Sequence, residues 1–279
     1  MFSLRPSLVL LCLLPGLTPS QAQTPVAMVS TGPGDLLLAP TRVVFEGRKR
    51  SAEINLSNIG AVRATYRISL VRMAMDESGG IREVPAEPGP VALESLVRFS
   101  PREVTLEPQE AQTVRLQLRK PADLPVGEYR IHLLFRGVPP AAAVMPEGGD
   151  DAKGISIQLT PIYGLSIPLI VRHGETSAKV SLADIGIDPT AQALRFRLER
   201  SGNRSVYGDL KATFIPRSGN PIPICQAKGV AVYSPNPSRK MTLPISAQKP
   251  LTDGRLRVTY SLPENEGGAL LAEGLLDLR

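Results

Sequence analysis

The side chains that most often carry catalysis are few in this sequence and isolated from one another. His132 and His173 are its only two histidines. The residues around His132 alternate so that it falls on the polar face of a predicted strand, and His173 falls at a predicted domain junction. No Gly-x-Ser-x-Gly elbow, phosphate-binding glycine loop or zinc-ligand spacing occurs. We interpret both histidines as surface or junction residues and predict that the protein is not an enzyme and needs no cofactor.

Cysteines and a short acidic run are the remaining candidates for reactive or metal-binding sites. Cys12 lies in an apolar N-terminal segment and Cys225 is the only other cysteine, so no disulfide can form once that segment is removed. A single free cysteine is most often buried and unreactive. The acidic run from Glu147 to Asp151 lacks the spacing of a calcium loop, and we interpret it as a solvated loop. No metal site is predicted.

The basic charge of the chain does not indicate a nucleic-acid-binding surface. The formal net charge is +6, but most lysines and arginines occur singly within alternating segments such as residues 113–119. The sequence has no tryptophan, and its longest basic run is the three residues Arg48 to Arg50. Solvated strand faces account for this distribution better than a phosphate-binding surface does, so no nucleic-acid partner is expected.

The first residues have the features of a signal peptide. Arg5 supplies a positive charge, residues 8–17 form a short apolar core, and Ser20-Gln21-Ala22 has small residues where a signal peptidase cleaves. We therefore expect cleavage after Ala22 and export to the periplasm. No later segment approaches the roughly 20 apolar residues of a membrane-spanning helix, so stable membrane insertion is not expected.

Alternating apolar and polar residues dominate the rest of the chain. Such alternation is typical of strands with one face on a core and the other in water. Glycines and prolines separate the segments, and no convincing amphipathic helix occurs, which predicts an all-β fold of two sandwiches. The clearest apolar faces are those of Ala52, Ile54 and Leu56; Tyr66, Ile68 and Leu70; Val114, Leu116 and Leu118; and Tyr129, Ile131, Leu133 and Phe135.

The same pattern begins again after His173-Gly174, which predicts a domain boundary there. We therefore divide the chain into a signal peptide of residues 1–22 and a tail of residues 23–35, followed by one domain at residues 36–173 and another at residues 174–279. The size of each domain is ordinary for a sandwich.

Residues 155–171 form the most unusual segment. Every odd position is apolar and the segment contains no charged residue, although most strands span only ~3–10 residues. Pro161 and Pro168 have opposite parity, which indicates an edge strand because proline cannot donate to a ladder. Two interpretations stay open: the apolar row pairs with another protein, or it packs on its own core throughout. The substitution Ile157→Asp distinguishes them, because it unfolds the domain only in the second case.

The order of several motifs resembles that of periplasmic pilus-assembly chaperones of the PapD type. The resemblance covers most of residues 36–174 and is fainter beyond them. The matching stretches are Ala39 to Gly47 (APTRVVFEG), Ala52 to Asn58, Ala64 to Met73, Phe99 to Arg102, Val104 to Pro108, Gln112 to Arg115, Leu124 to Arg130 and Ile167 to Arg172.

This resemblance implies two immunoglobulin-like sandwiches in a boomerang arrangement and a function in pilus or fimbrial assembly. It implies that a long edge strand complements an incomplete subunit by donating alternate apolar side chains, here Ile155, Ile157 and Leu159. It also implies that Arg42 grips the subunit's C-terminal carboxylate, which suits a guanidinium fork. Pilus or fimbrial subunits would be the partners, and the involvement of an outer-membrane usher stays open.

The resemblance has two further implications, and this sequence departs from one of them. The resemblance implies an ion-pair network between the domains made by Glu128, Arg172 and Asp253. It also implies a second, lysine anchor for the client, but Pro168 stands at that position. The alternative is a structural or adhesive protein of the periplasm or cell surface, made of the same two sandwiches but without chaperone activity.

Overall fold

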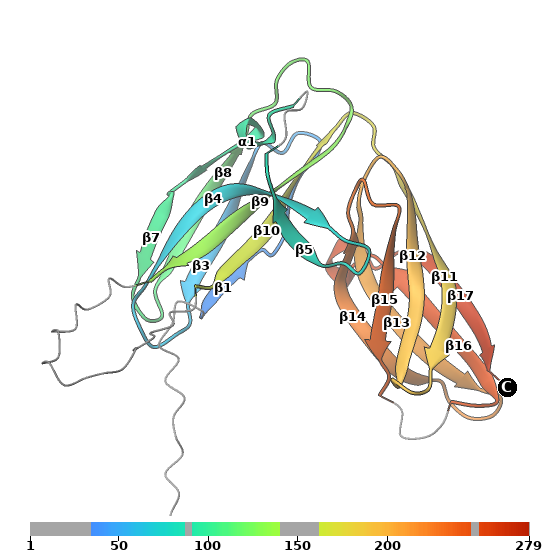
Figure 1. The fold of residues 1–279 in the computed structure, drawn as a ribbon. Helices are drawn as coiled ribbons and strands as arrows, with labels where there is room; N and C mark the ends of the chain where they lie inside the picture. The colour runs from blue at the N-terminus through green and yellow to red at the C-terminus, as the bar shows by residue number, and fades with distance from the viewer. Residues whose placement is uncertain (1–34, 87–90, 140–161, 247–250, 279) are drawn as a thin grey trace, which may run out of the picture. The chain divides into compact units, whose positions relative to one another are not determined.

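The structure is a computed structural model that describes residues 35–86, 91–139, 162–246 and 251–278 (Figure 1). The predicted signal peptide, almost all of the predicted tail, and the predicted donor residues Ile155, Ile157 and Leu159 lie outside the described residues. Within them, no helix is long and apolar enough to cross a membrane. Residues 31–279 belong to one unit, which contains both sandwiches.

All strands up to residue 173 build the first sandwich. One sheet has the strand order β1-β3-β8-β6, and the other has the order β2-β10-β9-β4-β5 with β7 also paired to β4. A single short helix, α1 (Leu93–Leu96), precedes β6. The strands are β1 (Leu36–Ala39), β2 (Val43–Phe45), β3 (Ser51–Asn58), β4 (Ala64–Met75), β5 (Ile81–Val84), β6 (Val97–Ser100), β7 (Glu103–Leu106), β8 (Ala111–Leu118), β9 (Gly127–Val138) and β10 (Gly164–His173).

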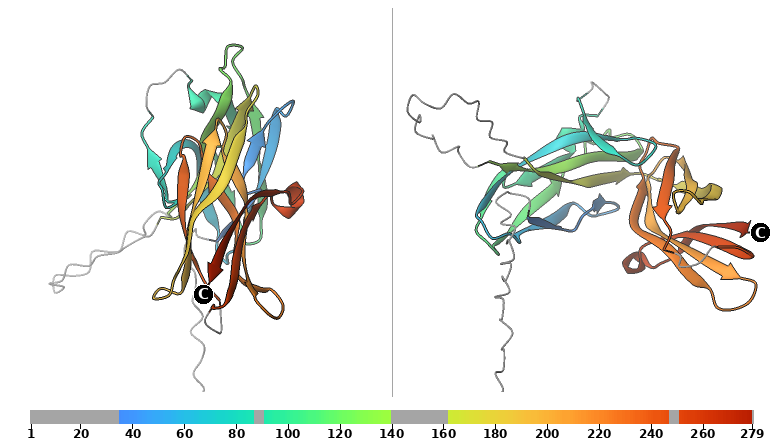
Figure 2. Two further views of the ribbon diagram at one scale, coloured as in Figure 1. Left: turned by 90° about the vertical axis from the view of Figure 1, so that its right-hand side faces the viewer. Right: turned by 60° about the horizontal axis from the view of Figure 1, so that its bottom comes forward.

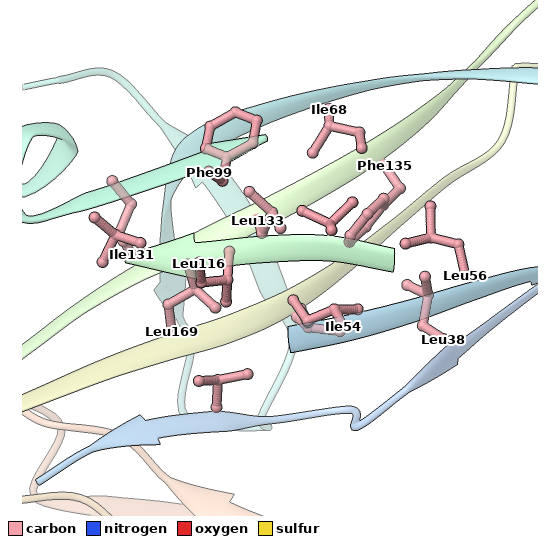
Figure 3. Close-up of a cluster of buried hydrophobic side chains, with 14 of the residues drawn as sticks. Leu38, Ile54, Leu56, Ile68, Phe99, Leu116, Ile131, Leu133, Phe135 and Leu169 are labelled. Carbon is pink, nitrogen blue, oxygen red and sulfur yellow. The ribbon is translucent and has the colours of Figure 1, made fainter. Parts of the chain in front are cut away.

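The alternating residues fill the space between these two sheets, as the sequence predicts. Ile54 and Leu56 of β3 and Leu116 of β8 lie on one side of the core, and Leu133 of β9 lies on the other (Figure 3). Each of these side chains is at most 1% exposed. Because one face of each of these core strands is removed from water, their apolar rows fix the register.

The first part of the chain contributes to both sheets. β1 pairs with β3 in one sheet, and β2, which follows after a break at Pro40 to Arg42, pairs with β10 in the other. β2 has only three residues and runs parallel to β10. The neighbouring strands β9 and β10 are antiparallel over ten residue pairs and lie side by side in every view (Figures 1 and 2).

Residues 178–278 form the second sandwich. Its sheets have the orders β11-β12-β15 and β14-β13-β16-β17. The core contains the alternating apolar faces of β12 and β16, with Leu194, Leu198 and Tyr260 fully buried. The strands are β11 (Ala178–Asp188), β12 (Ala193–Gly202), β13 (Val206–Pro216), β14 (Ile222–Val232), β15 (Ser238–Pro244), β16 (Gly254–Ser261) and β17 (Leu270–Leu278), and a 3-10 turn η1 (Glu264–Glu266) precedes β17. The all-β prediction with two sandwiches is therefore confirmed.

Candidate functional site: the open edge of β10 and the adjoining cleft

Strand β10 is paired on both sides along only part of its length. Its whole length, from Gly164 to His173, pairs with β9. On its other side, β2 pairs only with Leu169, Ile170 and Val171. The side of Gly164 to Pro168 that faces away from β9 is therefore an open sheet edge, which we call the open edge of β10.

The hydrogen-bond pattern shows which backbone groups this edge presents. The Gly137 N–H donates to the Tyr163 carbonyl at 2.9 Å, so Tyr163 and the odd positions after it direct their backbone groups toward β9. The even positions direct theirs to the other side. The N–H and C=O groups of Gly164 and Ser166 therefore point to the open edge. Pro168 has the same parity, so its missing N–H costs no bond to β9, which explains why a proline is tolerated within this strand.

The apolar row of β10 changes its surroundings between two successive odd positions. Ile167 is 3% exposed and Leu169 is fully buried in the core of the first sandwich (Figure 3). Leu165 lies on the same face of the strand but is 43% exposed, and Tyr163 before it is 52% exposed. The own-core interpretation therefore holds for the side chains from Ile167 onward, and the edge-strand interpretation fails from Leu169 to Val171, where β2 and β9 flank the strand. At Leu165 and Tyr163 the apolar row is only partly covered.

Arg42 lies in a cleft that the two sandwiches line. Its side chain is 11% exposed, and its guanidinium pairs with Glu266 of η1, Nη1 to Oε1, at 3.5 Å. The guanidinium also lies over the Tyr207 ring, 4.3 Å from the ring centre. Burial lowers the pKa of Arg42, and Glu266 opposes that effect. The Nε atom is buried and has no hydrogen-bond partner among the described residues, so it can still donate to an incoming acceptor.

The cleft has a volume of about 260 Å³, and several charged side chains are part of its lining. Arg172, at the end of β10, donates through Nε to Glu128 at 3.0 Å and through Nη1 to Glu46 at 2.9 Å. The Glu128 side chain is 1% exposed and also accepts hydrogen bonds from the backbone N–H and the hydroxyl of Ser205 in the second sandwich. Glu128 thus joins the end of β10 to the second sandwich.

Asp253 takes no part in this cluster, which corrects the network that the sequence resemblance implies. It pairs with Arg217 at 2.9 Å, and both side chains are more than two-thirds exposed. Its φ of 58° puts it in the left-handed region, which aspartate tolerates better than most residues. Asp253 is therefore a turn residue before β16, and Glu46 is the second carboxylate that faces Arg172. Glu46 directly follows the three-residue strand β2. So short a strand shows no alternating pattern, and the sequence therefore did not indicate the role of Glu46.

His132 is not a surface residue, contrary to the prediction from alternation. It is 3% exposed, its Nδ1 atom lies 3.4 Å from the Ser166 hydroxyl, and its ring packs edge-on to Tyr233 of the second sandwich. Arg130 covers the face of the same Tyr233 ring at 4.1 Å. Burial, with a smaller contribution from Arg130, lowers the pKa of His132 to about 4. The polar face of β9 at Arg130 and His132 is thus buried against the second sandwich, which alternation within one strand cannot indicate.

The cleft supplies cations other than the missing lysine. Pro168 is buried and has no charge to offer. Three arginines line the cleft instead, namely Arg42, Arg172 and Arg204. Arg204 is 35% exposed and approaches a carboxylate, that of Glu46, only at 3.8 Å. Arg42 and Arg204 therefore retain hydrogen-bonding capacity that Arg172, which is held by two glutamates, has already used.

Outside this cleft, the described residues offer little chemistry. They include no group of three or more histidine, cysteine or acidic side chains placed to hold a metal ion. Cys225 is partly buried, and burial raises the pKa of its thiol, which opposes formation of the reactive thiolate.

Comparisons with known proteins find similar solved structures only. No protein-family model and no curated protein sequence matches the chain. The chaperone CupB2 of Pseudomonas aeruginosa is 14% identical, and the match covers 87% of this chain and all of that one with a TM-score of 0.42. The chaperone DraB of E. coli is 13% identical over 88% of this chain and 96% of that one, with a TM-score of 0.42.

A third solved structure contains a chaperone with its client. A chain of the complex between the SafA pilin and the SafB chaperone of Salmonella enterica is 17% identical over 88% of this chain and 97% of that one, with a TM-score of 0.43. At these identities and TM-scores, the likeness by itself assigns neither a family nor a function to this chain.

Proposed function

We propose that this protein is a periplasmic chaperone that holds incomplete β-sandwich subunits, of the pilus or fimbrial kind, by pairing an extended client segment with the open edge of β10. The observation that carries the proposal is the open edge itself, with its partly exposed apolar side chains at Tyr163 and Leu165. A long apolar edge is normally a hazard for aggregation, and proteins blunt such edges with charge or cover them. Gly164 to Pro168 contains no charge, and no described strand pairs with its edge away from β9.

Strand addition uses the two features that this edge offers. The backbone groups of Gly164 and Ser166 supply hydrogen bonds that any extended chain can accept and donate. The side chains of Tyr163 and Leu165 supply contacts that depend on the client's own side chains, so they add selectivity. Ile155, Ile157 and Leu159 continue the same alternation toward the N-terminus, and the proposal assigns them to the donated row.

In this proposal, Arg42 anchors the client's C-terminal carboxylate. A carboxylate entering the cleft replaces Glu266 as the partner of the guanidinium and also accepts from Nε, which lacks a partner among the described residues. Arg204 supplies the second positive charge that Pro168 cannot. Charge-assisted bonds of this type are about twice as strong as neutral ones, so the anchor fixes the register of the client along β10.

The test is to recover client complexes from the native periplasm with the tagged wild type, Leu165→Asp and Leu37→Asp, and to identify the bound proteins by mass. Leu37 is also a leucine on an edge strand of the first sandwich and is 53% exposed. A charge at position 165 would enter the client interface, so we expect this variant alone to lose the client. In the wild-type complex, the Ser166 amide should become protected from hydrogen exchange.

Equal recovery of the same partners by all three proteins would contradict the proposal. Recovery of the chain itself as a permanent component of a surface assembly would instead favour the structural or adhesive alternative, because a chaperone leaves its client.

A further inference from the structure

The first sandwich contains a second hollow, which is larger than the cleft and lies between different strands. It has a volume of about 780 Å³ and is bounded by β4, α1 and β6. Ser69 and Leu70 of β4 line one side of it, and Phe99 of β6 lies on the other. Three arginines surround it: Arg98, Arg102 and Arg119. We call this hollow the arginine groove.

The charges around the groove are strongly unbalanced. The one acidic residue among its described lining residues, Glu94, is neutralised by Arg72, which donates to both of its carboxylate oxygens, at 2.7 Å and 3.1 Å. No carboxylate of a described residue pairs with any of the three groove arginines, although Arg63, Arg67 and Arg115 of the same sandwich each pair with a glutamate.

One groove arginine is also held in place. The Arg102 guanidinium lies over the Phe99 ring, 5.0 Å from its centre, which is a favourable cation–π distance. The groove thus presents positive charge that no described carboxylate neutralises and that is partly oriented before any ligand arrives.

A free strand edge runs along the groove. Among the described strands, β6 is the last of its sheet and pairs only with β8. The Arg119 N–H donates to the Leu96 carbonyl at 2.7 Å. By the alternation of an antiparallel ladder, the backbone groups of Val97 and Phe99 therefore point away from β8, to the unpaired side.

The groove side of β4 is also unpaired in its middle. β7 pairs with β4 at residues 64–67, the Ile68 N–H donates to the Arg102 carbonyl, and β5 pairs with β4 at residues 72–75. Ser69 and Leu70 in between face no described strand on this side. A ligand in the groove thus meets backbone donors and acceptors on the β6 side, part of an apolar core at Phe99, and arginines around the rim.

We infer that the arginine groove binds an extended acidic segment of a partner protein, which adds to the free edge of β6. Its backbone bonds to Val97 and Phe99, and its carboxylates pair with Arg98, Arg102 and Arg119. A polypeptide fits these features better than a sulfated or phosphorylated polymer, because only a polypeptide can continue the ladder of β6. The groove lies on strands other than β10, so the inference holds whether or not β10 binds a client.

The experiment measures binding of a fluorescein-labelled nine-residue peptide of alternating glutamate and valine to the full chain by fluorescence anisotropy at low salt. A peptide with glutamine in place of every glutamate is the control ligand. The double variant Arg98→Gln/Arg119→Gln removes the groove charges. The double variant Arg63→Gln/Arg115→Gln lowers the net charge equally on the same sandwich and is the matched control.

We expect the glutamate peptide to bind the wild type and the control variant with similar affinity, to bind the groove variant at least tenfold more weakly, and to protect the Val97 and Phe99 amides from hydrogen exchange. The glutamine peptide should bind at least tenfold more weakly than the glutamate peptide. If both double variants lost affinity for the glutamate peptide equally, net charge alone would explain the binding, and the inference would be overturned. Absence of binding, or binding without protection of these two amides, would also overturn it, as would groove-dependent binding of a heparin fragment in place of the peptide.

Discussion

The two halves of β10 have the same alternating pattern but opposite surroundings. From Leu169 to Val171 the strand lies between β9 and β2. At its end, Arg172 forms a buried ion pair with Glu128. From Gly164 to Pro168 it has β9 on one side and no described strand on the other. Leu165 and Leu169 are the same residue type on the same face, yet one is 43% exposed and the other is fully buried.

This difference shows that the neighbouring strands, and not the side-chain types, divide β10 into a part that is paired on both sides and a part with one open edge. Three residues of β2 are enough to close one edge of the second half, and the first half is left open where β2 ends. In the proposed function, the first half accepts a foreign strand without unfolding, because the second half holds β10 in the sandwich. The following substitutions test that division, in order of decreasing effect on the free energy of unfolding.

Removing Glu128 should break the anchor of the second half. In Glu128→Ala the guanidinium of Arg172, only 8% exposed, keeps Glu46 but loses its buried partner, and two hydrogen bonds from Ser205 are also lost. Breaking a buried ion pair costs about 3–5 kcal/mol. Urea denaturation should show a loss near the lower end of that range, since Glu46 remains.

The control for this anchor is Asp253→Asn. Its ion pair with Arg217 is solvent-exposed, so the expected cost is about 0–1 kcal/mol. Equal costs for Asp253→Asn and Glu128→Ala would contradict the assignment of Glu128 to the buried junction.

Truncating Leu169 should destabilise the second half through its core. Leu169→Ala leaves a cavity among Ile54, Leu116 and Leu133 (Figure 3), and such substitutions cost about 2–5 kcal/mol. The midpoint of urea denaturation should fall accordingly. A cost below about 1 kcal/mol would mean that the second half is not part of the core.

The boundary between the halves should be sensitive to acid through His132, which faces Pro168 across the ladder. Its pKa is about 4 in the fold and about 6.5 in the unfolded chain, so the fold favours the neutral ring. The resulting stability is complete above pH 6.5 and is lost as the pH falls toward 4, by about 3 kcal/mol. His132→Gln should flatten the stability profile over this range.

The other histidine supplies the control for that pH dependence. His173→Gln removes a ring that lies outside the cluster of Tyr233 and Arg130, so the profile between pH 4 and 6.5 should keep the wild-type slope. A wild-type slope in His132→Gln would show that other groups cause the acid sensitivity.

Leu165→Ala should have the smallest effect on folding, within about 0.5 kcal/mol, because the side chain is already in contact with water. Denaturation curves that overlay those of the wild type, together with weaker client recovery, would separate binding from stability in the first half. A cost as large as that of Leu169→Ala would instead show that Leu165 packs on the protein's own core.

The sequence determined the fold class and most of the core, because a strand with one wet face must alternate. The apolar faces of β3, β8, β9, β12 and β16 are read directly from that alternation, and so is the restart of the pattern after His173. The pairing of Glu128 with Arg172 was also within reach, although only through a family resemblance and not through any local pattern.

Only the tertiary structure decided which parts of those strands are covered. Alternation describes the two faces of one strand and carries no information about its edges or about a second sandwich that packs on a polar face. For that reason the sequence left the role of residues 155–171 open, placed His132 in water, assigned Asp253 to a buried network and did not indicate Glu46 or Glu266. The end of β2 beside Leu169 marks where β10 becomes open, and it depends on contacts between residues more than a hundred positions apart.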